Sequence, residues 1–259
     1  MKPVSTSPLN APPDPAPWDA PRFDMIPGTQ PIGPYDWLHL SDTYAAQMQE
    51  RLTLTAQRFG DVIGQVERAT PAIAELYDFV IETLRRHPDF TVTEDAVICP
   101  DGRTVVLADP LITMAHLVQE DLCLMEKVGD EYALTAAILC FPAGWTLSEK
   151  LGHPMTRIHA PVTSYDDMAA KRVGRLFEGL QVDRPILRWN GNYKTHGNLY
   201  GPETEYARHD DPVPLERPFF RSERQCLVRL PKTHAILFSI HTYLWRLQDL
   251  PVSPPPKSE

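Results

Sequence analysis

The sequence predicts an α+β fold, in which an antiparallel five-stranded sheet with covering helices is preceded by an N-terminal helical extension. Three observations support this prediction. Apolar residues in the first half of the chain recur at helical spacing, whereas five strand-like runs are concentrated after residue 120. One long amphipathic pattern separates the second run from the third. With 259 residues, the chain is long enough to bury a sizeable core.

The first 120 residues consist of a proline-rich segment followed by helical patterns. Residues 1–36 are expected to be extended. Their composition cannot form a core of its own, so removal of residues 1–27 is expected to leave stability unchanged. The helical extension covers residues 37–120. Its expected elements are a helix from Ser41 or Asp42 to Phe59, a helix from Pro71 that ends before His87, short strands at 96–99 and 104–107, and a helical turn at 113–119.

The strands of the second half, with a helix between the second and the third, follow the element order of a Per-ARNT-Sim (PAS) domain. Gly129 and Asp130 form the turn of the first hairpin. A PAS scaffold holds its ligand between helix and sheet, where concave apolar pockets are common. We predict a PAS-like core over residues 121–249 and a disordered tail over 250–259. The expected elements are strands at 121–128, 132–141, 185–193, 225–230 and 235–243, and a helix at 164–180.

Composition excludes several classes of protein. The net charge of −9 and the isoelectric point near 5.5 argue against nucleic-acid binding, because no basic stripe is present to follow phosphates. The four cysteines lack the CxxC spacing of zinc or iron–sulfur sites and are expected to be reduced and buried. The N-terminus lacks the apolar core of a signal peptide, and no apolar run reaches the roughly 18 residues that span a bilayer. These features predict a cytoplasmic protein that binds neither nucleic acid nor membrane.

The segment Cys140–Tyr165 concentrates polar and aromatic residues between a strand and a helix, as binding sites often do. Within it, His159 precedes Ala160-Pro161 and a helix start, which fix the backbone. A rigidly held imidazole could serve as an axial ligand of a porphyrin iron or of another metal. The alternative is a buried histidine whose ring bonds a backbone carbonyl. His153, in the same loop, is the second candidate.

Other residues near this loop suit a planar anionic ligand. Lys150, Arg157 and Arg188 could pair with the two propionates of a haem, although ordinary surface charge is the alternative. Trp145 could line a porphyrin edge or could simply pack. No GxGxxG, Walker, GxSxG or HExxH motif is present, so electrons for any redox chemistry are expected to come from another component.

A second group of polar residues, at 217–227, leads into the fourth predicted strand. In a strand, Glu223 and Gln225 point to one face and Arg224 to the other. A carboxylate in a largely apolar pocket is costly unless paired, so Glu223 could hold an ammonium group beside a metal. The alternative is a solvated charge pair at a sheet edge. His241 is either a sheet-face ligand or a packed imidazole. The tyrosines that could supply a phenol are Tyr165, Tyr193 and Tyr243.

Several stretches resemble a known family. FPAGWTLSEKLGHPMTRIHAPVTSY, LRWNGNY, RSERQCLVRLP and AILFSIHTYL are similar to the alpha subunit of haem-dependent oxidative N-demethylases, a dimethylamine-oxidising group with a PAS-fold haem domain. The resemblance extends from Trp37 to Leu247. The sequence departs from the family pattern at Thr163, where IHxPVP has its second proline, and at His241, where FxIRTY has arginine. It also has RWNGNY where the family has RxNW.

The resemblance implies a b-type haem with His159 as the axial iron ligand. It also implies dioxygen and a small secondary amine such as dimethylamine, held by Glu223 of the ERQ motif. Of the tyrosines named above, Tyr165 and Tyr193 are the further catalytic candidates. Arg224, in the same motif, joins the candidates for cofactor binding. In this family, electrons come from NADPH through separate subunits with flavin and a 2Fe–2S centre, and tetrahydrofolate accepts the formaldehyde unit.

The expected function is therefore haem-dependent oxidative N-demethylation with release of formaldehyde. Two alternatives stay open, because family membership does not by itself establish catalysis. One is a PAS-type haem sensor of gas or redox state. The other is a haem-free PAS-like binding module. The departures near the pocket could also alter which amine is accepted.

Overall fold

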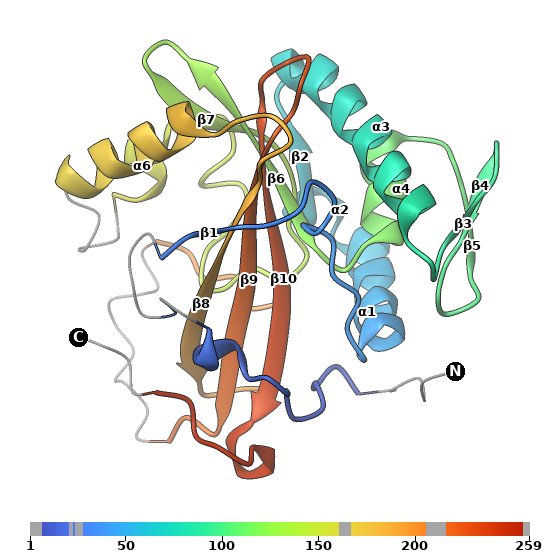
Figure 1. The fold of residues 1–259 in the computed structure, drawn as a ribbon, viewed down its shortest axis with the longest axis vertical. Helices are drawn as coiled ribbons and strands as arrows, with labels where there is room; N and C mark the ends of the chain where they lie inside the picture. The colour runs from blue at the N-terminus through green and yellow to red at the C-terminus, as the bar shows by residue number, and fades with distance from the viewer. Residues whose placement is uncertain (1–6, 21–22, 24–27, 161–166, 206–215, 256–259) are drawn as a thin grey trace.

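A seven-stranded antiparallel sheet forms the centre of the computed structural model, with the strand order β1-β8-β9-β10-β6-β7-β2 (Figure 1). The structure describes residues 7–20, 23, 28–160, 167–205 and 216–255. Five adjacent strands of the sheet correspond to the five expected from the sequence. Their bounds are β6 (Asp121–Val128), β7 (Glu131–Ile138), β8 (Ile186–Lys194), β9 (Phe219–Arg229) and β10 (Ile236–Arg246).

Two short strands extend the sheet beyond the expected five. β1 (Gln30–Pro31) pairs with β8, and β2 (Ile63–Gln65) pairs with β7. The prediction of five strands is corrected to seven, because strands this short show no alternation of apolar and polar residues. The residues expected to form a short hairpin belong to a separate three-stranded sheet. Its strands are β3 (Thr91–Val92), β4 (Ala96–Ile98) and β5 (Thr104–Val106).

Helices lie on both faces of the central sheet (Figure 1). Neighbouring residues of β10 point to opposite faces, so Leu237 packs in one apolar cluster with Leu76 of α3, and Ile236 packs in another with Phe177 of α6. The sheet therefore separates two apolar layers. No helix among the described residues is long and apolar enough to cross a membrane. The helices are α1 (Tyr44–Gln57), α2 (Phe59–Val62), α3 (Thr70–Arg86), α4 (Pro110–Leu117), α5 (Met155–Ile158) and α6 (Asp167–Gly179).

Proline and capping residues set the boundaries of the helices. α3 has Pro71 in its first turn and ends directly before His87-Pro88, since the residue before a proline disfavours helical backbone angles. α4 begins after Asp109, whose side chain accepts a hydrogen bond from a backbone N–H of the first turn at 3.0 Å. The predicted second helix is therefore confirmed, and the turn expected at 113–119 is a helix that begins earlier.

A buried ion pair joins α1 to the start of β6. Arg51 Nη1 lies 2.7 Å from Asp121 Oδ1, and neither side chain is more than 1% exposed. The Asp121 carboxylate also accepts hydrogen bonds from the backbone N–H groups of Cys140 and Phe141, at 2.7 and 2.8 Å. One carboxylate therefore fixes the point where the chain leaves β7 and enters the loop that contains His159.

The N-terminal arm, residues 7–20, packs on the sheet. The Asn10 N–H donates to the Leu244 carbonyl at 2.9 Å, and the Leu244 N–H donates back to Asn10 Oδ1 at 3.0 Å. The Trp18 ring meets the Trp245 ring edge-on, with 5.7 Å between the ring centroids. The expectation that residues 1–27 can be removed without loss of stability stays a prediction, and these contacts argue against it because they satisfy the backbone of Leu244 in β10.

Asn10→Ala is expected to lower the unfolding free energy by roughly 1–3 kcal/mol, since it leaves the buried Leu244 N–H without its acceptor. Each kcal/mol corresponds to about 2–4 °C in the thermal midpoint for a chain of this size. Pro12→Ala, at an exposed position of the same arm, is the control and should leave the midpoint unchanged. Equal midpoints for the two variants in a thermal melt would contradict the anchoring role of Asn10.

Part of the C-terminal tail also packs on the sheet. The sequence predicts disorder from residue 250, but Pro254 is buried. The carbonyl of Pro254 accepts a hydrogen bond from the Tyr193 hydroxyl at 2.8 Å. Residues 250–255 are therefore held against β8, and the last four residues lie outside the described part of the chain.

Candidate functional site

His159 directly follows α5, the short helix that begins after Pro154. Its ring Nδ1 lies 3.0 Å from the Met155 carbonyl oxygen, and since a carbonyl can only accept, Nδ1 carries the proton. This tautomer presents Nε2 as an acceptor atom. Burial lowers the pKa of His159, which favours the neutral ring. Metal-binding histidines have this arrangement, in which the other ring nitrogen donates to a carbonyl or a carboxylate.

An ion cluster of Lys150, Arg157 and Glu205 holds the loop that carries His159. Glu205 Oε1 lies 2.6 Å from Lys150 Nζ and 2.9 Å from Arg157 Nη1. Lys150 Nζ also donates to the Ile158 carbonyl at 2.7 Å. Hydrogen bonds from Arg157 and Lys150 lower the pKa of Glu205 to about 2, so the acid stays ionised. Two of the three cations that the sequence assigns to haem propionates therefore share an acid of this chain and fix the loop.

An apolar layer lies between α5, α6 and the sheet. Trp145 is half-buried against it, as are Met155 and Ile158 of α5. Phe177 of α6 belongs to the same cluster. A ligand held between these helices and the sheet would be largely excluded from water. The sheet side of the layer includes Cys123, Met125, Leu134, Ala137, Leu227 and Ile236.

Glu223 lies on β9 and is buried on the sheet face that carries this layer, because Leu227 follows four residues later on the same strand. Its Oε1 accepts hydrogen bonds from Nη2 and Nε of Arg221, at 3.1 and 3.2 Å. Its Oε2 accepts one from Gln225 Nε2 at 2.9 Å. The carboxylate that the sequence assigns to an ammonium group is therefore already paired with Arg221, and its Oε2 can accept a further donor.

Arg188 lies on β8 directly opposite Gln225. Its Nε atom is buried and has no hydrogen-bond partner within the described residues. Burial lowers the pKa of Arg188, and the Glu223 carboxylate offsets this effect only in part. The site thus contains a desolvated guanidinium beside a paired carboxylate.

Residues 28–258 match a family model described as haem-dependent oxidative N-demethylase, alpha subunit-like. The chain belongs to this family. The family is named for a haem-dependent oxidative demethylase, which is an oxidoreductase, and the term alpha subunit implies other subunits. The resemblance drawn from the sequence motifs is therefore confirmed.

The residues of this N-demethylase family member fit the haem that the family name implies. His159 is held in the tautomer that a metal requires, and it is close in sequence to Met155 and Ile158 of the apolar layer. The buried Nε of Arg188 adds a hydrogen-bond donor for an anionic group. The donor set and its apolar surroundings thus match a largely hydrophobic cofactor with one axial nitrogen ligand.

Two predicted site residues of the N-demethylase family member lie on the opposite face of the sheet. Arg224 donates to the backbone carbonyls of residues 36 and 37, before α1. The Tyr193 hydroxyl donates to the C-terminal segment. Alternation along β9 and β8 turns both side chains away from Glu223, so neither belongs to the group around that carboxylate. Tyr165 lies outside the described residues.

The two other histidine candidates have different surroundings. His241 Nδ1 lies 3.0 Å from Glu120 Oε1, and both side chains are fully buried. The Nε2 of His241 has no partner in the described part of the chain, but this ring lies opposite Arg224 on the sheet face away from α6. His153 is exposed. His241 and Glu120 therefore form a histidine–carboxylate pair in the core.

Two residues with a role around the site were not assigned one from the sequence. Glu205 pairs with residues far away in the chain, so no local pattern marks it. Arg221 is different, because it lies two residues before Glu223 in a strand. That spacing places both side chains on one face, and it is the signal that could have identified the pair.

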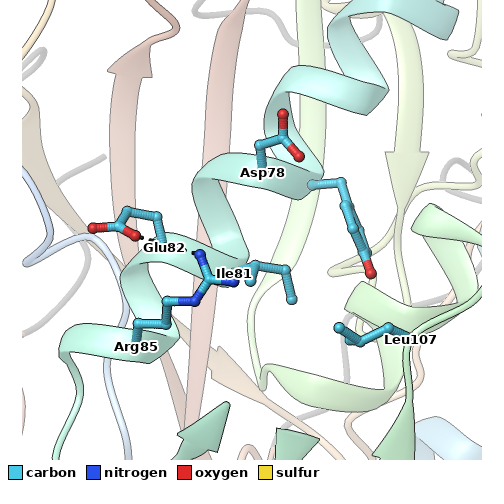
Figure 2. Close-up of a pocket in the computed structure, with 6 residues that line it drawn as sticks. Asp78, Ile81, Glu82, Arg85 and Leu107 are labelled. Carbon is cyan, nitrogen blue, oxygen red and sulfur yellow. Dashed lines mark ion pairs between the residues drawn. The ribbon is translucent and has the colours of Figure 1, made fainter. Parts of the chain in front are cut away.

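Two surface cavities lie elsewhere on the molecule. One, of about 370 Å³, is formed by α3 and Leu107, and Figure 2 shows Asp78, Ile81, Glu82 and Arg85 beside it. The other, of about 260 Å³, lies where β6, α6 and the turn before β10 meet. Neither is lined by a residue that the sequence assigns to the site.

Proposed function

We propose that this chain is the haem-binding component of an oxidative N-demethylase that acts on a small secondary amine. In the balanced reaction, the amine R–NH–CH3, dioxygen, two electrons and two protons give R–NH2, formaldehyde and water. The electrons come from NADPH through a separate component with flavin and a 2Fe–2S centre. The observation that supports the proposal most is the neutral, Nδ1-protonated His159.

The order of elements supports a PAS-like core over residues 121–249. Two strands, β6 and β7, are followed by α5 and α6 and then by β8, β9 and β10. The helix α6 packs on the sheet face that carries Glu223. In a core of this kind, the haem would be held by residues of the helices and of the sheet. The helical extension over residues 37–120 covers the other face.

Each residue of the proposed site has a distinct role. His159 would bind the haem iron, and Trp145 would contact an apolar part of the haem. When bound, the haem supplies the oxidative chemistry. Arg221 and Gln225 orient Glu223, whose Oε2 accepts an N–H from the ammonium group of the substrate. The apolar layer excludes water from the N-methyl group.

An absorption spectrum of the purified, haem-loaded protein is the first test. We expect a Soret band that changes on addition of dimethylamine, since the amine is proposed to bind next to the haem. The lack of a Soret band after haem loading would overturn the haem assignment. A band without a response to any secondary amine would favour the haem sensor over the enzyme.

Glu223→Gln is expected to weaken dimethylamine binding about tenfold or more, and to leave haem content unchanged. The substitution keeps the shape of the side chain but removes its charge, which leaves Arg221 to repel the ammonium group. Glu126→Gln is the matched control, since Glu126 is a half-buried sheet carboxylate that accepts a hydrogen bond from Thr135 at 2.6 Å. An unchanged titration of Glu223→Gln with dimethylamine would discard this role of Glu223.

A further inference from the structure

We propose that the amine bound at this site also carries a carboxylate, as an N-methyl amino acid does, with its ammonium group at Glu223 and its carboxylate at Arg188. The inference rests on the proposed function and specifies its substrate class. It follows from three features of the site: the charge balance, the unused hydrogen-bonding capacity, and the register of β8 and β9.

The charges on this part of the sheet favour a zwitterion over a simple dialkylammonium ion. Arg221 already neutralises Glu223 through two hydrogen bonds to Oε1. Arg188 then adds an uncompensated positive charge, and a dialkylammonium ion would add a second one in surroundings of low dielectric constant. A zwitterion adds no net charge, and its carboxylate supplies the anion that Arg188 lacks.

Arg188 and Glu223 each have hydrogen-bonding capacity that the described residues do not use. Arg188 Nε is buried without a partner among them, and buried donors of this kind are rare in folded proteins. A guanidinium binds a carboxylate through two parallel N–H···O bonds, which Nε and a terminal nitrogen can supply together. Glu223 Oε2 accepts one bond from Gln225 and has a lone pair for a second donor.

The register of β8 and β9 places the two charged groups within reach of one small molecule. Arg188 is the cross-strand partner of Gln225, and Glu223 is two residues from Gln225 on the same face. Diagonal neighbours of this kind lie about 7–8 Å apart, within reach of long side chains. An α-amino acid carries its nitrogen and its carboxylate on one carbon atom, so it can contact both side chains at once.

The other cations of the predicted site are engaged differently. Lys150 and Arg157 both bond Glu205, and Arg224 bonds backbone carbonyls on the opposite face of the sheet. Arg188 is therefore the cation best placed to receive an external anion. A haem propionate is the competing anion, and the experiment separates the two.

The test uses the haem-loaded, full-length protein and follows the ferric Soret band at equilibrium. The probes are dimethylamine, N-methylglycine and N-methylglycine methyl ester, which lacks the negative charge of the amino acid. We expect N-methylglycine to bind about tenfold or more tightly than the other two. Equal or weaker binding of N-methylglycine, with dimethylamine still bound, would overturn the inference and leave the proposed function intact. No response to any of the amines would overturn both.

Arg188→Gln should abolish the preference for N-methylglycine and leave haem content unchanged. Arg184→Gln, at an exposed position just before β8, is the matched control and should keep the preference. If Arg188→Gln retains less haem and its remaining haem-bound fraction still prefers N-methylglycine, Arg188 holds a propionate and the inference is overturned. If Arg188→Gln does not fold, the comparison of the three probes on the wild-type protein decides the question.

Discussion

His159→Ala is expected to abolish the ligation spectrum of the haem-loaded protein, or to reduce haem retention to background. The imidazole is the proposed axial ligand, and its orientation is set by the 3.0 Å hydrogen bond from Nδ1 to the Met155 carbonyl. Alanine removes this ring but leaves the backbone of α5 and the Lys150–Glu205 ion pair in place. Absorption spectra and haem content, recorded after identical loading, measure the effect.

Two other histidines provide matched controls. His153→Ala changes an exposed side chain, and His241→Ala changes a buried one on the opposite face of the sheet. Both variants should retain the Soret band. Free imidazole added to His159→Ala should restore part of the band, because the apolar layer around the missing ring is intact. If His159→Ala keeps the wild-type spectrum and either control loses it, the ligand assignment is wrong.

Asp121→Ala is expected to lower the unfolding free energy by about 3–5 kcal/mol, as is typical when one partner of a buried ion pair is removed. It leaves Arg51 charged in the core, and it deprives the N–H groups of Cys140 and Phe141 of their acceptor. Haem retention should fall as well, because these residues begin the loop that carries His159. Urea denaturation measures the change in free energy.

Two comparisons separate the buried pair from general effects of charge. The double variant Arg51→Met/Asp121→Ala should be more stable than Asp121→Ala alone, since no charge is left unpaired. Asp61→Ala removes one partner of an exposed pair with Arg58 at 3.5 Å, and it should cost at most about 1 kcal/mol. A loss of stability in Asp121→Ala no larger than in Asp61→Ala would show that the buried pair contributes little.

Elements with a strong local pattern could be predicted from the sequence. The turn between β6 and β7 could be predicted because Gly129 marks it in the sequence. In the structure Gly129 has a φ of 64°, a backbone conformation that favours glycine. The start of β9 at Phe219 was placed six residues too late, because the charged stretch RSER is typical of a loop. In the structure those charges are buried, and the pair formed by Arg221 and Glu223 is what makes this tolerable.

The composition of the site could be predicted only in part. Strand alternation correctly separates Glu223 from Arg224, but it does not say which face the helices cover. The positions of Tyr193 and Arg224 relative to the helices therefore became clear only from the tertiary fold. The ion pair of Lys150 and Glu205 joins residues 55 positions apart, so it depends on the tertiary fold and leaves no local signal.

β10 is the last strand along the chain, yet it lies between β9 and β6 in the sheet. During synthesis, the hairpin of β6 and β7 leaves the ribosome long before this central neighbour, and the β6 edge stays unpaired until β10 is released. Unpaired edges of this kind recruit other strands, so the nascent chain is most prone to aggregation in that interval. The apolar layer between α6 and the sheet is complete only afterwards, because it includes Ile236 of β10. A ligand bound in this layer would therefore enter after the first strands have formed.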